Sequence, residues 1–507
     1  MILNRQLYPI RGDINLQIKE KWAFKARLNN ERWIMNKKNF ILPSSILLIT
    51  ACQNQPQQKT ELPKPNIVYI LADDLGYGDL GCYGQQKIDT PNLDQLAKDG
   101  MLFTQHYAGS TVSAPSRSAL LTGEHTGHTY IRFNGNYQMR SDPEDITVAR
   151  NLKDFGYVTA MIGKASTGCS TAPGQPNEKG FDHFFGYLGH AQAHAYFPEF
   201  LHRNDKQIDF PENGGSKTWR GETYSPDLIL KEALSFIEKE KDNPFFLFYA
   251  SPLPHAQLWA PIEFEEPYQG KFEETPFKGK NPNKMPHYGI SLTPNTTTAA
   301  MISRLDWEVG QILKQLTDLG LDKHTIIMFS SDNGPHQEGG RSPEFFNSSG
   351  PFRGIKRDLY EGGIRVPFIV KWPGVIEPGT STDHISAFWD VLPTLTEIAG
   401  APTPKNIDGL SFLPTLRGND AEQEKHEYLY WEFYERGGKQ AVRKGNWKAI
   451  KLKVSKDPDT PIELYDLQHD PKEMNDVAGE YPEIVREMAD IFNTARTEST
   501  IKSLYKN

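Results

Sequence analysis

The sequence of 507 residues has few cysteines, no excess of positive charge and no long apolar run. Three cysteines are too few for a disulfide framework. A formal net charge of −8, with no basic stripe, argues against nucleic acid as a partner. The chain also shows no internal repeat. What remains is a globular protein, because 37% hydrophobic and 24% charged residues over this length suit one large domain or two with a substantial core.

One apolar run near the start is too short to cross a membrane, and it ends on a cysteine. Lys37 and Lys38 precede about a dozen mostly apolar residues, and Ile49-Thr50-Ala51-Cys52 follows them. This order is the pattern of a secretory signal, and its final cysteine is similar to that of a bacterial lipoprotein signal. A buried helix with an incidental cysteine is the alternative. We expect an exported protein, lipid-anchored through Cys52 in the bacterial periplasm or at the outer membrane.

Changes in composition divide the chain into five parts. Residues 1–34 are rich in charge and are expected to be an upstream extension outside the fold. Residues 35–51 form the expected signal peptide, and the polar run 52–63 suits a flexible tether. The main domain, which carries the candidate site, is expected at 64–400, and a C-terminal subdomain at 401–507.

Four buried strands of the main domain are predicted to end at polar side chains. Each is an apolar run of β-branched or aromatic residues, as in a mainly parallel sheet that is buried on both faces. The runs start at Asn66, Tyr157, Phe245 and Thr325, and the polar groups after them are Asp73-Asp74, Gly163-Lys164, His255 and Asp332-Asn333. Helical patterns lie between these runs. The alternation predicts an α/β fold that binds its ligand at the carboxyl ends of the strands.

The pattern changes in the C-terminal part, where short strands replace the long apolar runs. The expected strands lie near 427–433, 440–443, 447–452 and 463–467, and a final helix near 482–496. This order predicts a smaller antiparallel sheet with a helix after it.

The side chains at two of the strand ends offer only oxygen ligands, which suit Ca²⁺ or Mg²⁺ better than zinc. They are Asp73, Asp74, Asp332 and Asn333. Adjacent acids at a turn are often solvated charges, but here a matching pair follows a second buried strand. Cationic and donor groups are expected around the metal, namely Arg117, Lys164, His255 and Lys356. A metal surrounded by cations suits a phosphate or sulfate ester.

The segment Ser113-Ala-Pro-Ser-Arg117-Ser-Ala-Leu-Leu-Thr-Gly123 resembles the signature of the formylglycine-dependent (type I) sulfatases in its serine form. The resemblance extends from Lys64 to the end of the chain. Its other motifs are Asp73-Asp74, Gly76-Tyr-Gly78, Gly163-Lys164, His255, Ser331–Gly334, Gly354–Gly363 and Leu464–Asn475. It implies an arylsulfatase-like bacterial carbohydrate sulfatase with an alkaline-phosphatase-like fold, a large mainly parallel sheet flanked by helices and a smaller C-terminal antiparallel sheet.

The resemblance also implies roles for individual residues. Ser113 would be oxidised by a serine-type maturase to formylglycine (3-oxoalanine), whose hydrate attacks sulfur, and would join the four oxygen side chains around one Ca²⁺ or Mg²⁺. A helix N-cap is the alternative role for Ser113. Arg117 would steady the metal end. Lys164 and Lys356 would bind sulfate oxygens, and His255 would bind sulfate and protonate the leaving alcohol.

The sequence departs from the family where many members read Gly-Lys-Trp-His-Leu-Gly. This chain reads Gly163-Lys-Ala-Ser-Thr-Gly168, so Ser166 replaces the histidine that helps to deprotonate the hydrate. A hydroxyl is no base near neutral pH. His194 is our first candidate for that role, ahead of His190 and His336, with substrate contact or a structural role as the alternatives for His194.

Together these features predict a sulfatase that acts on carbohydrate sulfate esters, such as oligosaccharides from galactans, ulvan or glycosaminoglycans. Long aromatic loops at 189–224 and 255–295 suit a rim that recognises one sugar. Glu432, Arg436 and Gln440 are further candidates to reach the pocket. The competing interpretations are a phosphoesterase or phosphonate hydrolase of the same superfamily, and a degenerate sulfatase that serves as a glycan-binding lipoprotein.

Overall fold

The computed structural model describes residues 64–501, except 136, 167–172, 280 and 282–283. The expected upstream extension, signal peptide and tether, with Cys52, lie outside the described residues. Everything described below belongs to one unit, Leu62–Asn507. Among the described helices, none has the length and apolar character needed to span a membrane.

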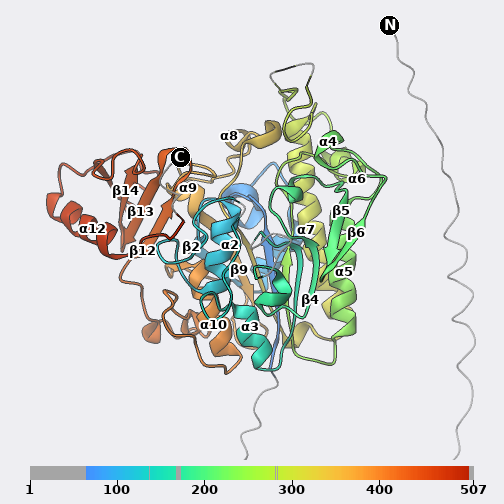
Figure 1. The fold of residues 1–507 in the computed structure, drawn as a ribbon, viewed down its shortest axis with the longest axis horizontal. Coiled ribbons are helices and arrows are strands. Elements are labelled where there is room, and N and C mark those ends of the chain that lie inside the picture. The colour runs from blue at the N-terminus through green and yellow to red at the C-terminus, as the bar shows by residue number, and fades with distance from the viewer. Residues whose placement is uncertain (1–63, 136, 167–172, 280, 282–283, 502–507) are drawn as a thin grey trace, which may run out of the picture. The chain divides into compact units, whose positions relative to one another are not determined.

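A mixed sheet of eleven strands forms the centre of this unit (Figure 1). Five neighbouring strands are parallel, in the order β8 (Thr325–Ser331), β1 (Asn66–Ala72), β7 (Phe245–Ala250), β3 (Val158–Lys164) and β4 (His183–Tyr187). Beyond β8 lie antiparallel β9 (Arg365–Lys371) and then β2 (Met101–Tyr107), which pairs with the short strands β10 (Thr380–Thr382) and β11 (Ser386–Ala387). Beyond β4 lie antiparallel β5 (Phe200–Arg203) and β6 (Lys206–Asp209). The four predicted strands are the ones at its centre.

Helices cover both faces of this sheet (Figure 1), because alternate residues of the central strands point to opposite sides. Val68 and Ile70 pack in one core with the helices α1 (Pro91–Lys98), α5 (Ser225–Lys239) and α7 (Pro294–Asp318). Ile67 and Tyr69 pack in the other with α2 (Ser113–Thr122), α3 (Val148–Asp154) and α10 (Val391–Ile398). Every residue of β1, β7 and β8 is buried, which explains why their sequences are apolar without alternation.

Short helical segments connect these elements. The α-helical ones are α4 (Gly215–Thr218), α6 (Ile262–Glu265), α8 (Pro343–Phe346), α9 (Glu361–Ile364) and α11 (Leu413–Leu416). The 3₁₀ turns are η1 (Tyr77–Asp79), η2 (Gly81–Tyr83), η3 (Pro176–Lys179), η4 (Gln192–His194), η5 (Glu266–Tyr268), η6 (Asp322–His324), η7 (Glu338–Gly340), η8 (Phe388–Asp390), η9 (Asp420–Glu422) and η10 (Glu435–Gly437).

A separate antiparallel sheet follows in the C-terminal part, as predicted. Its strands are β12 (Leu429–Phe433), β13 (Lys439–Lys444), β14 (Trp447–Leu452) and β15 (Ile462–Asp466), and α12 (Pro482–Thr494) follows them. Tyr430 and Val442 face α12, which covers one side of this sheet (Figure 1). Trp431 faces the other way, packs on Tyr107 and Trp389 of the main domain, and donates its indole N–H to the carbonyl of Ala108 at 2.9 Å.

A buried ion group ties the two sheets together. The Lys448 Nζ on β14 lies 2.8 Å from Glu361 Oε1 at the start of α9 and 3.0 Å from Glu473 Oε1, and all three side chains are fully buried. Glu473 Oε2 also accepts the backbone N–H of Glu361 at 2.6 Å. Burial raises the pKa of Glu473 to about 7, against the opposing charge of Lys448. Lys448 therefore compensates two carboxylates that have no access to water.

We predict that Lys448→Met lowers the free energy of unfolding by about 3–5 kcal/mol, because it leaves the buried carboxylate of Glu473 without its cation and that of Glu361 with Arg365 alone. The measurement is the urea midpoint. Glu473→Gln is the matched control, since it removes one buried charge but keeps the pair between Lys448 and Glu361, and its loss should be clearly smaller. Equal midpoints for Lys448→Met and the unaltered protein would contradict this account.

Candidate functional site

The carboxyl ends of four central strands bring together side chains from distant parts of the sequence. Asp73 and Asp74 follow β1, and Asp332 and Asn333 follow β8. Lys164 ends β3, and His255 lies in the loop after β7. Ser113 and Arg117 reach them from α2, and Lys356 from the loop before α9. All of these residues are buried. The structure thus gathers the predicted metal ligands and the predicted sulfate-binding groups in one place.

Three carboxylates converge in the middle of this group. One oxygen each of Asp73, Asp74 and Asp332 lies within 4.8 Å of the others. Asp332 Oδ1 accepts the backbone N–H of Asp74 at 3.0 Å, and Asp74 takes a left-handed backbone conformation with φ of 63°. Asn333 Nδ2 donates to Asp74 Oδ1 at 2.7 Å, whereas the buried Asn333 Oδ1 has no hydrogen-bond partner among the described residues. An unsatisfied amide oxygen therefore accompanies the three acids.

This donor set fits a hard divalent cation. Burial raises the pKa of Asp73 to about 7, and the negative charges of Asp332 and Asp74 add to this effect while Lys164 opposes it. Burial also acts on Asp74, but Lys356 and His336 outweigh it and hold the pKa of that carboxyl below its usual value. A divalent ion would stabilise the ionised form of all three acids and would bind the amide oxygen Oδ1 of Asn333, which has no hydrogen-bond donor among the described residues.

Ser113 is the first residue of α2 and touches two groups of the site. The Oγ of Ser113 donates to Asp73 Oδ1 at 3.0 Å. Lys164 Nζ lies 3.2 Å from this Ser113 Oγ and 2.5 Å from Asp73 Oδ2. The N-cap residue of this helix is Val112, so Ser113 does not have the capping role that was its structural alternative. Its hydroxyl instead faces the acids and the lysine.

Arg117 lies one turn further along α2 and holds two strand ends. Its Nε and Nη2 donate to Asp332 Oδ2 at 2.9 and 2.8 Å, and its Nη1 donates to the carbonyl of Lys164 at 2.6 Å. Every one of these groups is buried. Arg117 therefore fixes the position of a metal-ligand candidate and of the backbone that carries Lys164.

Lys356 and His255 lie on the side of Asp74. Lys356 Nζ is 2.6 Å from Asp74 Oδ2 and 3.0 Å from His255 Nε2, and that nitrogen is 3.2 Å from Asp74 Oδ2. The other ring nitrogen, Nδ1, is hydrogen-bonded to the carbonyl of Ala256 and must be its donor. Burial, followed by the charges of Lys356 and Lys164, lowers the pKa of His255 well below its usual value. His255 is accordingly neutral, with its Nε2 lone pair toward Lys356.

The three histidines proposed to replace the missing base lie at different places. The ring of His194 is parallel to that of His255, with centroids 4.3 Å apart, and His190 lies 6.2 Å from His194. His336 stacks near His255 at 5.3 Å, but its Nε2 bonds the carbonyl of Pro254 and its Nδ1 accepts the N–H of Glu338, so both of its nitrogens are engaged. Among the described residues, none of these three rings contacts Ser113. The role of His194 as a base stays a prediction.

Ser166, the substituted position, has a buried hydroxyl without a hydrogen-bond partner in the described part of the chain, and its φ is 57°. The groups that do touch the Ser113 hydroxyl are Asp73 and Lys164.

Two charged residues beside this site, Arg357 and Glu338, were not predicted from the sequence. Arg357 Nη1 donates to Glu338 Oε1 at 2.5 Å, and Glu338 also lies 4.0 Å from Lys356 Nζ. Arg357 Nε reaches Glu435 Oε2 at 3.4 Å. Their positions in the sequence could have indicated them, because Arg357 directly follows Lys356 and Glu338 lies just beyond Asp332-Asn333.

Two residues suggested as pocket contacts are buried and bonded to other side chains. Glu432 is fully buried and pairs with Arg132 and Arg496, at 2.6 Å in each case. Gln440 Nε2 donates to the hydroxyl of Tyr430 at 3.0 Å. Arg436, by contrast, is exposed.

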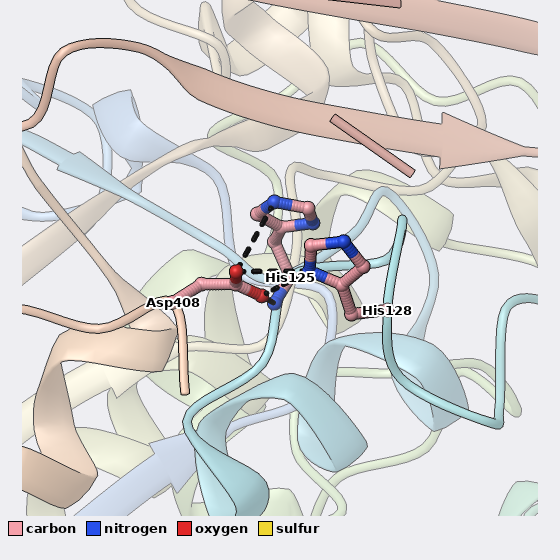
Figure 2. A group of neighbouring side chains, drawn as sticks. All are labelled: His125, His128 and Asp408. Atoms are coloured by element: carbon pink, nitrogen blue, oxygen red, sulfur yellow. Dashed lines mark hydrogen bonds and ion pairs between the residues drawn. The ribbon is translucent and has the colours of Figure 1, made fainter. Parts of the chain in front are cut away.

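A second histidine–carboxylate group, shown in Figure 2, lies in the loop after α2. His128 Nδ1 is 2.9 Å and His125 Nε2 is 3.6 Å from Asp408 Oδ1. The N–H of Gly127 donates to His125 Nδ1 at 3.1 Å, so the neutral ring carries its proton on Nε2, the nitrogen that faces Asp408. Burial lowers the pKa of His125 to about 4, which keeps it neutral. That nitrogen has no lone pair for a metal, and the group serves to fasten the loop.

Comparisons with known proteins agree with this geometry. The family described as "Sulfatase" matches residues 65–401, and the one described as "N-sulphoglucosamine sulphohydrolase, C-terminal" matches residues 353–498. An N-acetylgalactosamine-6-O-sulfatase of Bacteroides thetaiotaomicron is 31% identical, over 90% of this chain and 98% of that protein. Human arylsulfatase A is 32% identical, over 83% of this chain and 86% of its own length.

A solved structure extends the likeness to the fold. The crystal structure of Ps i-CgsB in complex with k-i-k-neocarrahexaose superposes with a TM-score of 0.71 at 27% identity, and covers 87% of this chain and 96% of that one. The first family match alone spans well over half of the chain and includes every residue that meets at the strand ends. This chain therefore belongs to the formylglycine-dependent type I sulfatases and is a sulfuric ester hydrolase.

Proposed function

We propose that the protein removes sulfate from a sulfated oligosaccharide, with galactose or N-acetylgalactosamine sulfates as the substrates to test first. The observation that carries this proposal is the contact of Ser113 with Asp73 and Lys164 beside three buried acids. The choice of sugar is supported by the N-acetylgalactosamine-6-O-sulfatase relative, which is matched over nearly its full length, and by the carrageenan oligosaccharide named for the similar structure.

In this proposal a serine-type maturase first oxidises Ser113 to the aldehyde, whose hydrate is the nucleophile. A Ca²⁺ held by Asp73, Asp74, Asp332 and Asn333 would favour ionisation of the attacking hydroxyl and neutralise charge on the sulfate. Lys164 donates toward the oxygen of residue 113, and Arg117 holds Asp332 in place. These contacts orient the nucleophile before substrate arrives.

The opposite side of the pocket would serve the leaving group. Lys356 would turn from Asp74 toward a sulfate oxygen, which leaves the Nε2 lone pair of His255 free to take up a proton from solvent and then to give it to the departing alcohol. His194, stacked on His255, is proposed to accept a proton from the hydrate in place of the histidine missing at Ser166. We further propose export and lipid attachment at Cys52, on the sequence pattern alone.

The proposed nucleophile is tested by peptide mass spectrometry on protein produced with a serine-type maturase. We expect the peptide with Ser113 to lack two hydrogens, and Ser113→Ala to abolish sulfate release from the sugars. Ser118→Ala is the control, because its hydroxyl lies on the same helix but contacts Thr129 and should leave activity intact. An unmodified Ser113 in an active preparation would contradict the mechanism.

The proposed calcium site is tested by thermal unfolding with and without Ca²⁺. Saturating Ca²⁺ at about a hundred times its Kd should stabilise the folded state by about 2.7 kcal/mol. Asn333→Ala and Asp332→Ala should lose that response. Asp408→Asn changes an acid in the group of Figure 2, away from the site, and should keep it. A full response in both site variants would rule out these ligands.

The role of His255 is tested with two leaving groups. His255→Ala should slow hydrolysis of a sugar sulfate by about 10²–10⁴-fold, because an alkoxide leaves poorly without a proton donor. Hydrolysis of 4-nitrophenyl sulfate should fall far less, since nitrophenolate needs no proton. Lys356→Ala, which removes a sulfate contact, should impair both substrates alike. Equal losses for His255→Ala on the two substrates would exclude it as the acid.

A further inference from the structure

The turn between β12 and β13, residues 434–438, is attached to the segment that follows Ser113. Glu435 Oε1 accepts the backbone N–H of Asn134 at 3.3 Å. The side-chain oxygen of Asn134 in turn accepts the backbone N–H of Ala114 at 3.1 Å. Two hydrogen bonds thus connect this turn of the C-terminal sheet with the residue next to the nucleophile.

The same turn is attached to the segment that carries Lys356. Glu435 Oε2 pairs with Arg357 Nε, and Lys439, just after the turn, places its Nζ 2.5 Å from the carbonyl of Arg357 and 2.9 Å from Asp358 Oδ1. Since Arg357 directly follows Lys356, the turn is held beside the sulfate-binding side of the pocket from two directions. A side chain that projects from this turn therefore has a fixed base beside the segments that carry Ser113 and Lys356.

Arg436 is the residue that projects. Its backbone is left-handed, with φ of 55° and ψ of 39°, and Gly437 and Gly438 continue the turn with φ of 94° and 78°. A left-handed conformation is uncommon for arginine, and it gives the turn a defined shape at this position. Among the described residues, the exposed guanidinium of Arg436 makes no hydrogen bond and no ion pair. It differs in this from Lys164, Lys356 and Arg357, which are each paired with a carboxylate.

We propose that Arg436 determines specificity by binding an anionic group on the sugar next to the sulfated one. A free guanidinium pairs with a carboxylate or a sulfate through two parallel hydrogen bonds, and both groups occur on sulfated polysaccharides. Lys164, Lys356 and Arg357 are already paired with carboxylates, whereas the contacts of the described residues leave the donors of Arg436 available for a second acidic group. The inference rests on the proposed carbohydrate substrate and adds the acidic neighbour to it.

The test compares four substrates that present the same N-acetylgalactosamine 6-sulfate. One is the monosaccharide, one is a disaccharide with a neutral neighbour, and one is a disaccharide with a glucuronate neighbour; a fourth with a sulfated neighbour separates the two anions. Arg436→Ala should lower kcat/KM on the acidic disaccharides about tenfold more than on the other two, mainly through KM. Added salt should reduce the same preference in the unaltered enzyme.

Three further variants separate charge from backbone effects. Arg436→Gly relieves the left-handed conformation and removes the charge, so it should behave like Arg436→Ala, and Arg436→Lys should keep part of the preference. Arg417→Ala removes an exposed arginine after α11 and should leave all substrates unaffected. Equal losses on every substrate, or no loss on the acidic ones, would overturn the proposal.

A binding measurement keeps this inference apart from the proposed function. Calorimetric titration of unmodified protein with the neutral and the glucuronate disaccharides needs no turnover. Tighter binding of the acidic sugar that is lost in Arg436→Ala would support the inference, whether or not the mature enzyme releases sulfate. Failure to release sulfate would count against the proposed function alone. The absence of any preference in the unaltered protein would refute the inference itself.

Discussion

Charge balance at the ends of β1 and β8 is the constraint on which the rest of the structure depends. Three carboxylates are removed from water there, and each would be costly without a partner. Each has a cation: Lys164 for Asp73, Lys356 for Asp74 and Arg117 for Asp332. These pairs cancel, so a bound divalent ion would make the pocket positive. A sulfate ester carries a negative charge, and further negative charge develops on its oxygens as the sulfuryl group is transferred. A positive pocket stabilises this developing charge.

The C-terminal sheet supports that charge balance indirectly, because its residues hold the segment that carries Lys356. Trp431 and its neighbours pack against the main domain, while Lys448 bonds Glu361, five residues beyond Lys356. On the other side of the same segment, Lys439 and Glu435 hold Arg357. The loop with Lys356 is therefore held between the two sheets. The second sheet thus fixes Arg357 and Asp358, the two residues that follow the cation paired with Asp74.

The sequence predicted the central strands and the edge at which the site lies, for a physical reason. Strands buried on both faces are apolar throughout, so the first polar residues after them mark their ends, as Asp73 and Asp332 do. The order β8-β1-β7-β3 then makes those ends neighbours. Contacts between loops leave no comparable pattern in the sequence. The contacts of Arg357 with Glu338 and Glu435 depend on side-chain directions that no local pattern encodes. Glu432 was a candidate for the pocket because it is charged, but the structure buries it in pairs with Arg132 and Arg496.

If Ser166 stands where many family members have a histidine, proton transfer in the proposed mechanism would fall to the stacked rings of His255 and His194. Burial lowers the pKa of both His255 and His194, and Lys164 and Lys356 lower both further. With centroids 4.3 Å apart, two protonated rings would add like charges to a buried site that already holds two lysines. The pair therefore accommodates at most one positive charge at a time. Because the carbonyl of Ala256 fixes the Nδ1 of His255, the proton that this ring exchanges with the pocket is the one on Nε2, and His194 supports the ring in the orientation that presents it.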